Sequence, residues 1–285
     1  MNWKKLQNGS DIRGVALEGI EGENVNLTEE VIMTIGKSFV CWLRKTMGVE
    51  NPTIAVGMDC RLSGNAIKGA FIKGAVEAGA NVVDCGLAST PAMFMTTISD
   101  TVKATASVMV TASHLPFNRN GLKFFTPKGG LDSKDIAAIL EIAENGEYAY
   151  DGAKGNATVM DFMSVYSRHI ADYIREGVKA DDYDHPLKGM HIIVDAGNGN
   201  GGFFEKILRS LGANTEGSQF LEPDGHFPNH IPNPENAEAM ASVCNAVETT
   251  NADLGVIFDT DVDRSAIIGR KGEPINRNRS EERRV

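Results

Sequence analysis

The sequence has few cysteines, no long apolar run and no excess of basic residues, and each of these absences excludes a class of protein. Only four cysteines occur in 285 residues, widely spaced and without a CxxC pair. We interpret them as small buried side chains in a protein of a reducing compartment. No run reaches the roughly 20 apolar residues that a membrane helix needs. The first ten residues, MNWKKLQNGS, lack the apolar segment of a signal peptide. We therefore expect a soluble cytoplasmic protein.

The charge balance is acidic, with a formal net charge of -10. This charge disfavours nucleic acids and anionic membranes as partners. An anionic substrate would then need a local positive site or a bound metal ion. Hydrophobic residues make up 42% of the chain, which is enough for a sizeable core, and the length favours about two domains.

Helical and strand-like segments alternate along the chain. Apolar residues at helical spacing predict helices at 28–47, 64–79, 133–144, 160–177, 202–212 and 234–250, with a short helix after Thr90. Apolar runs predict strands at 53–59, 81–86, 107–110, 122–125, 191–196, 254–259 and 265–269. We expect Asp132 to cap the helix 133–144, and Asn233 to cap the last helix with Pro234 in its first position.

This alternation predicts mostly parallel sheets covered by helices on both faces. The segment 145–157 is rich in Gly, Asn and charged residues and marks a boundary, after which the pattern restarts. We expect two consecutive three-layer α/β/α domains with mixed, mostly parallel sheets. Their ranges are 1–150 and 158–276, followed by a disordered charged tail at 277–285.

Three acidic residues alternate in 259-DTDVDRS-265, directly after an apolar run. A hard divalent cation needs several oxygen ligands at once, and Asp259, Asp261 and Asp263 would supply them. An EF-hand is excluded, because its sixth and twelfth positions, counted from Asp259, are Arg264 and Arg270 instead of Gly and an acid. We favour a Mg²⁺ site over the alternative, a solvated acidic turn.

The segment 197-GNGNGG-202 matches the pattern G-x-G-x-x-G between a predicted strand and a predicted helix. This context suits a dinucleotide site and keeps an oxidoreductase open as an alternative. The acid expected about twenty residues later is only loosely matched by Glu216 or Glu222. We favour a glycine-rich turn that lets strand and helix pack closely.

The segment 111-TASHLPFNRNGLKFF-125 places Ser113 and His114 between two predicted strands. It is either a polar connection or a reactive loop on a rigid scaffold. Neighbouring residues of an extended segment point to opposite faces, so His114 is poorly placed as a base for Ser113. No G-x-S-x-G elbow surrounds the serine. A serine with a lysine nearby and a metal elsewhere fits phosphoryl transfer better than hydrolysis.

Taken together, these motifs resemble the α-D-phosphohexomutase family, the phosphoglucomutases and phosphomannomutases. The matching segments, in order, are 10-SDIRG-14, 56-VGMDCRLSG-64, 111-TASHLP-116, 120-NGLK-123, 193-IVDAGNG-199, 223-PDGHFPNHIPNPE-235 and 253-DLGVIFDTDVDR-264. The resemblance runs from near the N-terminus almost to residue 278. It implies domains I and II of the phosphoglucomutase fold.

The resemblance implies transfer of a phosphoryl group between C1 and C6 of a hexose phosphate, through a hexose 1,6-bisphosphate. Ser113 would carry the phosphoryl group, and Lys123 would be the general acid or base at the sugar hydroxyl. Arg13 and His114 match further catalytic positions. Asn120 and Arg264 match substrate- or phosphate-binding positions. The implied ligands of Mg²⁺ are Asp259, Asp261, Asp263 and the phosphate on Ser113.

The chain departs from the family pattern at Leu115, where Asn is more usual, and at Thr260 and Ser265 beside the acidic loop. None of these changes removes a ligand or the nucleophile. Family members have four domains, of which this chain matches the first two. We therefore expect little mutase activity and self-association through the surface left bare. The alternatives are a non-catalytic phosphosugar-binding remnant and, less favoured, the oxidoreductase.

Overall fold

The computed structural model describes residues 2–275, and the chain divides into two compact units. The first unit comprises residues 1–162 and the second begins at Met163. The predicted tail at 277–285 lies outside the described residues.

The first unit contains a mixed sheet with the strand order β1-β2-β6-β5-β3-β4-β8, and β7 pairs with β6. Strands β5, β3, β4 and β8 run parallel, whereas β1, β2, β6 and β7 pair antiparallel. The strand bounds are Gln7–Asn8, Asp11–Val15, Thr53–Met58, Asn81–Leu87, Ala106–Val110, Arg119–Thr126, Gly129–Gly130 and Ala157–Val159 for β1 to β8. Because β8 pairs with β4, the first unit continues beyond residue 150.

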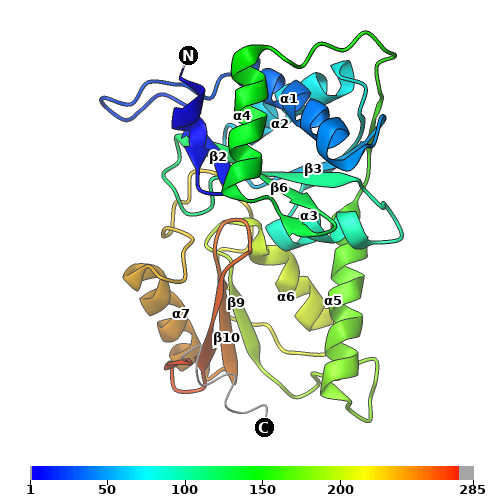
Figure 1. Ribbon diagram of the computed structural model, residues 1–285. Helices are drawn as coiled ribbons and strands as arrows, with labels where there is room; N and C mark the ends of the chain where they lie inside the picture. Colours follow the sequence, from blue (N-terminus) through cyan, green and yellow to red (C-terminus); the bar gives the residue numbers. More distant parts are fainter. Residues whose placement is uncertain (1, 276–285) are drawn as a thin grey trace. The chain divides into compact units, whose positions relative to one another are not determined.

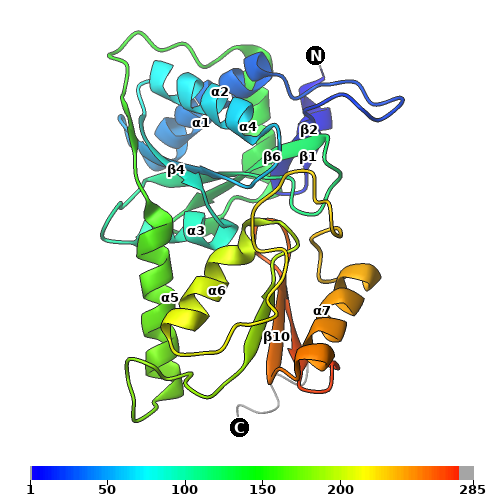
Figure 2. The same ribbon diagram turned by 180° about the vertical axis from the view of Figure 1, so that it is seen from behind.

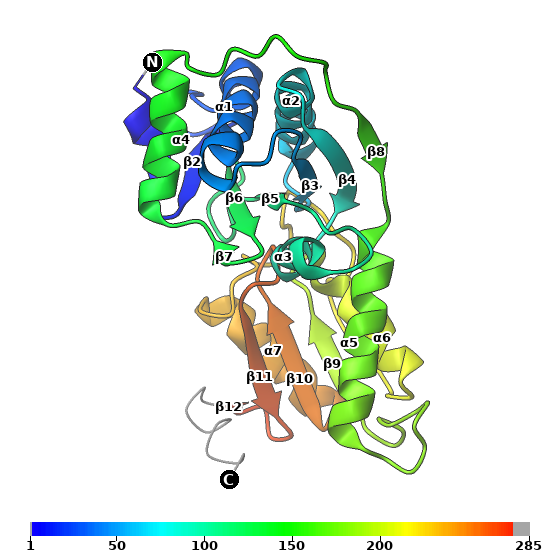
Figure 3. The ribbon, with the colours of Figure 1, turned by 45° about the vertical axis from the view of Figure 1, so that its right-hand side comes forward.

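Helices cover both faces of this sheet (Figure 3), with α1, α2 and α4 on one face and α3 on the other. Their bounds are Glu29–Met47 for α1, Gly64–Glu77 for α2, Thr90–Ile98 for α3 and Ser133–Asn145 for α4, after a short 3₁₀ helix at Trp3–Leu6. The predicted cap at Asp132 is confirmed, since Asp132 and Asp135 form a reciprocal capping box at the start of α4.

Aromatic side chains fill the core between the sheet and the larger helix layer. Phe39 and Trp42 of α1, Phe71 of α2 and Phe124 of β6 lie with neighbouring ring centroids 4.7 to 6.3 Å apart. Such pairs add attraction beyond the apolar area that they bury. Through Phe124 this layer packs against β6, the strand that follows the loop of Ser113.

The second unit contains a four-stranded sheet in the order β12-β11-β10-β9, with one parallel pair, β10 and β9. The strand bounds are Ile192–Asp195, Leu254–Phe258, Ser265–Gly269 and Pro274–Ile275 for β9 to β12. Helices α5 at Phe162–Val178 and α6 at Phe203–Ser210 lie on one face, and α7 at Ala237–Thr250 lies on the other (Figures 1 and 2).

The burial pattern of β9 explains these three layers. Ile192 and Val194 belong to the core cluster that contains Ile207 of α6, whereas Ile193 packs with Val243 of α7. Successive residues of a strand point to opposite faces, so a strand that is buried on both faces needs a helix on each side. The predicted fold class, two consecutive three-layer α/β/α units with mixed sheets, is confirmed. The parallel pairs are β5–β3, β3–β4 and β4–β8 in the first unit and β9–β10 in the second.

One predicted helix start is wrong. The last helix, α7, is capped by Asn236 rather than Asn233, because Asn236 Oδ1 accepts hydrogen bonds from the N–H groups of Glu238 and Ala239. The Asn233 side chain is engaged elsewhere and accepts a hydrogen bond from Arg264. The sequence did not predict five strands: β2, which lies between β1 and β6, the edge strands β1, β8 and β12, and the short β7.

A search of the described residues finds no helix whose length and apolar content would let it cross a membrane.

Helices α1 and α2 approach so closely that Gly74 cannot gain a side chain without a shift. A Cβ at Gly74 would lie 2.1 Å from the carbonyl oxygen of Met33, whereas a Cβ at Gly69 on the same helix meets nothing within 4 Å. We expect Gly74→Ala to lower the free energy of unfolding by about 1–3 kcal/mol, as overpacking does. Gly69→Ala, the matched control, should be neutral or stabilising by up to about 1 kcal/mol, because alanine favours helix. Urea denaturation measures both; equal effects at the two positions would contradict the close approach.

Candidate functional site

Ser113 lies in the loop that follows β5, in a conformation that side chains rarely adopt. The residue is buried, and its φ angle of 53° lies in the left-handed region. Its N–H donates to Thr111 Oγ1 at 2.8 Å, and the Thr111 hydroxyl donates to Asp59 Oδ2 at 2.7 Å. The backbone of Ser113 is therefore tied to a carboxylate that is fully buried.

A buried guanidinium holds the rest of this loop. Arg61 Nη1 donates to the carbonyl of Pro116 at 2.7 Å and to that of Arg119 at 3.1 Å. Its Nη2 donates to the carbonyls of Ser113 and Leu115. Arg61 lies in the family motif 56-VGMDCRLSG-64, but nothing in the sequence indicates its role.

Three further predicted residues come from strands that neighbour this loop. Arg13 on β2 donates from Nη1 to the carbonyl of Ala112 at 3.0 Å. Asn120 and Lys123 lie on β6, the antiparallel neighbour of both β2 and β5, and both are buried. Arg13 thus contacts the loop at Ala112, whereas Lys123 pairs with Met109, one residue before the end of β5.

The remaining residue of this group, His114, is exposed beside Ser113. Asn120 on β6 donates from Nδ2 to Ser63 Oγ at 2.9 Å, which fixes the amide side chain. Gly121 follows Asn120 on β6. A Cβ there would lie 2.3 Å from the Ile12 carbonyl oxygen, so this position requires glycine. Close strand packing therefore accounts for the glycine of 120-NGLK-123.

In the second unit, Asp259, Asp261 and Asp263 form an acidic cluster directly after β10. One oxygen from each carboxylate lies within 4.8 Å of those of the other two, so the group could hold a metal ion. Asp259 and Asp261 are fully buried. Burial, followed by the charges of Asp261 and Asp263, raises the pKa of Asp259 to about 7, against the opposing effect of Arg264.

Two observations test whether this cluster suits a metal ion. Its donors are hard carboxylate oxygens, the ligands that Mg²⁺ and Ca²⁺ prefer. The hydroxyl of Thr260, inside the cluster, is buried without a hydrogen-bond partner. Burying like charges and a polar hydroxyl is costly without a cation or a donor, so the residues fit a divalent ion.

Arg264 is tied to this cluster. Its Nε and Nη2 donate to Asp259 Oδ2 at 3.1 and 2.9 Å, and its Nη1 donates to Asn233 Oδ1 at 3.3 Å. The side chain is 22% exposed. The guanidinium therefore reaches solvent while it joins the acidic cluster to the segment before α7.

Neighbouring protein atoms surround the glycines of 197-GNGNGG-202. A Cβ at Gly199 would lie 2.8 Å from Thr260 Cα, and one at Gly202 would lie 2.1 Å from the Leu221 carbonyl oxygen. The N–H of Asn200 donates to the carbonyl of Thr260 at 2.9 Å. This close packing favours the interpretation of a scaffold turn, which also supports the backbone of the acidic cluster.

Comparison with known proteins decides the family. Residues 4–149 match the family model described as phosphoglucomutase/phosphomannomutase, alpha/beta/alpha domain I, and residues 165–272 match that of domain II. The chain belongs to the phosphoglucomutase/phosphomannomutase family. The resemblance seen in the sequence motifs is thereby confirmed.

Similar proteins of this family are longer than this chain. The phosphoglucomutase of Neisseria meningitidis serogroup B is 32% identical over 260 residues, which cover 91% of this chain and 53% of that protein. The phosphoglucomutase/phosphomannomutase of Thermococcus kodakarensis is 33% identical over 272 residues, covering 94% and 56%. The chain thus spans about half the length of these relatives.

A solved structure supports the same grouping. The crystal structure of a phosphoglucomutase/phosphomannomutase family protein from Burkholderia thailandensis matches with a TM-score of 0.75 and 27% identity. The match covers 94% of this chain and 55% of that one.

A buried His–Asp pair in the second unit also escaped sequence reasoning. His230 Nε2 lies 3.0 and 3.1 Å from the two carboxylate oxygens of Asp195, which also accepts a hydrogen bond from Gln219. Burial lowers the pKa of His230, but the hydrogen bond and charge of Asp195 and the Ile231 carbonyl raise it more, so the net pKa is raised. The only signal in the sequence is that Asp195 lies in the motif 193-IVDAGNG-199 and His230 in the motif 223-PDGHFPNHIPNPE-235.

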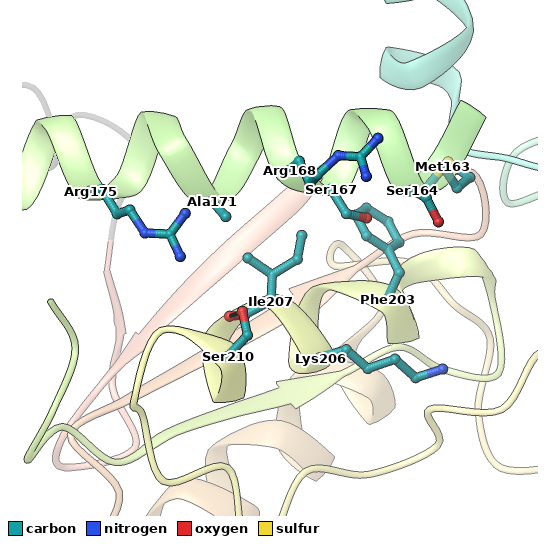
Figure 4. Close-up of a pocket in the computed structure, with 10 residues that line it drawn as sticks. All are labelled: Met163, Ser164, Ser167, Arg168, Ala171, Arg175, Phe203, Lys206, Ile207 and Ser210. Atoms are coloured by element: carbon teal, nitrogen blue, oxygen red, sulfur yellow. Dashed lines mark hydrogen bonds between the residues drawn. The ribbon is translucent and has the colours of Figure 1, made fainter. Parts of the chain in front are cut away.

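The second unit also has an open cavity of about 390 Å³ away from these residues (Figure 4). It lies between α5 and α6 and has basic side chains at its margin, Arg168, Arg175 and Lys206. One of these cations is already paired, since Arg175 Nη1 donates to Asp172 at 2.8 Å. None of the residues predicted for catalysis or metal binding lines this cavity.

The raised pKa of His230 makes a part of the stability pH-dependent. This contribution is fully present below the unfolded pKa, about 6.5, and is lost as pH rises through the raised folded pKa. We expect the free energy of unfolding of the unaltered protein to fall with rising pH in this window more than that of His230→Gln. Urea denaturation from about pH 6 to about pH 9 gives the difference.

The matched control is His169→Gln on α5, which replaces an exposed histidine. It should leave the pH profile unchanged. Parallel profiles for the unaltered protein and His230→Gln would show that the pair does not stabilise charged His230.

Proposed function

We propose that this chain carries the phosphoserine and metal-binding steps of a phosphohexomutase, which moves a phosphoryl group between C1 and C6 of a hexose. One observation carries the proposal. In a chain of this family, Ser113 lies in the loop that follows the buried strand β5, has a left-handed conformation and is held there by buried groups. A preorganised nucleophile needs this kind of fixed geometry.

In the proposed reaction, Ser113 Oγ bears the phosphoryl group and a sugar hydroxyl accepts it. The bond between phosphorus and the sugar oxygen forms as the bond to Oγ breaks, and Lys123 in its neutral form takes the hydroxyl proton. The hexose 1,6-bisphosphate then returns its other phosphoryl group to Ser113 by the reverse step, with Lys123 returning the proton.

Charged and polar residues would bind the anionic groups in this reaction. Arg13 and His114 flank the serine loop and are proposed to bind phosphoryl oxygens. Asn120 and Arg264 are proposed to bind substrate or phosphate. Phosphoryl transfer depends mainly on positioning and on neutralising the phosphoryl oxygens, which suits cations fixed by hydrogen bonds.

We propose Mg²⁺ as the ion, held by Asp259, Asp261 and Asp263. When bound, it would supply positive charge that neutralises phosphoryl oxygens. Support comes from the mutual distance of the three carboxylates and from the unpartnered hydroxyl of Thr260. The chain spans about half the length of these relatives, and we propose loading and unloading of Ser113 as the part of the reaction that these residues carry.

A label-transfer experiment tests the proposal. The chain is incubated with Mg²⁺ and hexose 1,6-bisphosphate carrying labelled phosphate, and the label is located by intact mass and peptide mapping. We expect one phosphoryl group on Ser113, none on Ser113→Ala, and an unchanged amount on Ser133→Ala, which alters an exposed serine. Binding of the sugar phosphate without any label would instead favour a non-catalytic phosphosugar-binding protein.

Mg²⁺ should stabilise the folded chain, because we expect it to bind the folded state and not the unfolded state. At a hundred times its Kd, a ligand adds about 2.7 kcal/mol to the free energy of unfolding. We expect Mg²⁺ to raise the Tm of the unaltered protein and of Asp100→Asn, which changes an exposed carboxylate. Asp261→Asn should lose this rise, whatever its own starting Tm. Equal rises in all three proteins would refute the metal site.

A further inference from the structure

One side chain binds four backbone carbonyls, three in the loop between β5 and β6 and one on the first residue of β6. These belong to Ser113, Leu115, Pro116 and Arg119, and the donor is the guanidinium of Arg61. The Arg61 side chain is 1% exposed. The loop is thus fastened from within the protein rather than by its own secondary structure.

The buried charge of Arg61 is balanced by Asp59. Arg61 Nε lies 3.3 Å from Asp59 Oδ2, and the Arg61 N–H donates to Asp59 Oδ1 at 3.0 Å. A planar guanidinium offers five donors in a fixed fork, whereas the ammonium of a lysine has three donors around one atom. A lysine at this position would keep the charge but could not serve carbonyls spread from Ser113 to Arg119.

The two residues together hold the Ser113 backbone on both sides. Asp59 fixes Thr111, whose hydroxyl oxygen accepts the Ser113 N–H, and Arg61 binds the Ser113 carbonyl. A left-handed conformation is unfavourable for a residue other than glycine and persists only where the surrounding structure holds it. Here the buried ion pair of Asp59 and Arg61 holds Ser113 in this conformation.

We propose that Arg61 is a positioning residue for phosphoryl transfer at Ser113, which acts by holding the serine loop through its carbonyls. The kinetic part of this inference rests on the proposed function of Ser113. The structural part does not, since it concerns only the conformation of residues 113–119. Arg61 acts through the backbone and is not assigned any contact with substrate.

The test compares Arg61→Lys with Arg119→Lys. Both make the same change within one loop system, but Arg119 pairs with Glu23 and its side chain is 33% exposed. Two readouts are taken: the rate of Ser113 phosphorylation at saturating hexose 1,6-bisphosphate, and hydrogen exchange of peptides spanning 111–121. We expect Arg61→Lys to slow transfer by roughly 100-fold, as misplacement of a reacting group by about 1 Å does. The donor concentration at half-maximal rate should change little.

Exchange should accelerate in 113–119 of Arg61→Lys while that of α4 stays unchanged, and Arg119→Lys should match the unaltered protein in both readouts. Arg61→Ala should regain part of its rate with added guanidinium ion. If Arg61→Ala does not fold, Thr111→Val tests the same scaffold by removing the hydroxyl that links Asp59 to Ser113.

Each outcome bears on the inference separately from the proposed function. Normal exchange in 113–119 of Arg61→Lys overturns the inference, whatever the phosphorylation data. Faster exchange with an unchanged transfer rate also overturns it, because the loop would then not limit the reaction. If the unaltered protein takes no phosphoryl group, the proposed function fails, and the exchange data alone decide whether Arg61 holds the loop.

Discussion

The buried ion pair of Asp59 and Arg61 is the interaction on which the geometry around Ser113 depends. Both side chains are essentially inaccessible to solvent. A buried pair of this kind contributes little net stability, but breaking it by removing one partner is strongly destabilising. The pair orients the groups around Ser113. Asp59 accepts a hydrogen bond from the Thr111 hydroxyl, and Arg61 donates to four backbone carbonyls in and beside the loop. A loop without regular secondary structure thereby gains a single conformation.

In the second unit, an arginine is likewise paired with a buried carboxylate, but here the carboxylate belongs to a cluster of like charges. Asp259 and Asp261 are buried together, which raises the pKa of Asp259 through desolvation and like charge. Arg264 offsets part of this cost by donating two hydrogen bonds to Asp259. The glycine-rich turn packs against the backbone of Thr260 and keeps the acidic loop in place. The rigid scaffold therefore holds the carboxylates together in spite of their mutual repulsion, which a bound cation would relieve. Binding sites are often preorganised in this way.

Features that depend on residues close in the chain could be predicted from the sequence. Features that depend on contacts between distant residues could not. Apolar runs located β5 and β10, and the acidic spacing located the cluster at 259–263, because these signals are local. The role of Arg61 could not be predicted, since its four carbonyl acceptors lie 52 to 58 residues away in the chain. The misplaced cap at Asn233 has the same cause: its side chain accepts a hydrogen bond from Arg264, 31 residues away. Strand β8 was missed because its three residues are exposed and gain their partner only from β4.

The conformation of Ser113 in a crystal structure of Arg61→Lys tests the central claim most directly. If the buried guanidinium holds the loop, Ser113 should leave the left-handed region, and residues 113–119 should adopt a different path or several paths. The β5 and β6 strands, which the sheet holds independently, should superpose on those of the unaltered protein. A Ser113 φ still near 53°, with the loop unchanged, would contradict the claim and assign the geometry to the strands alone.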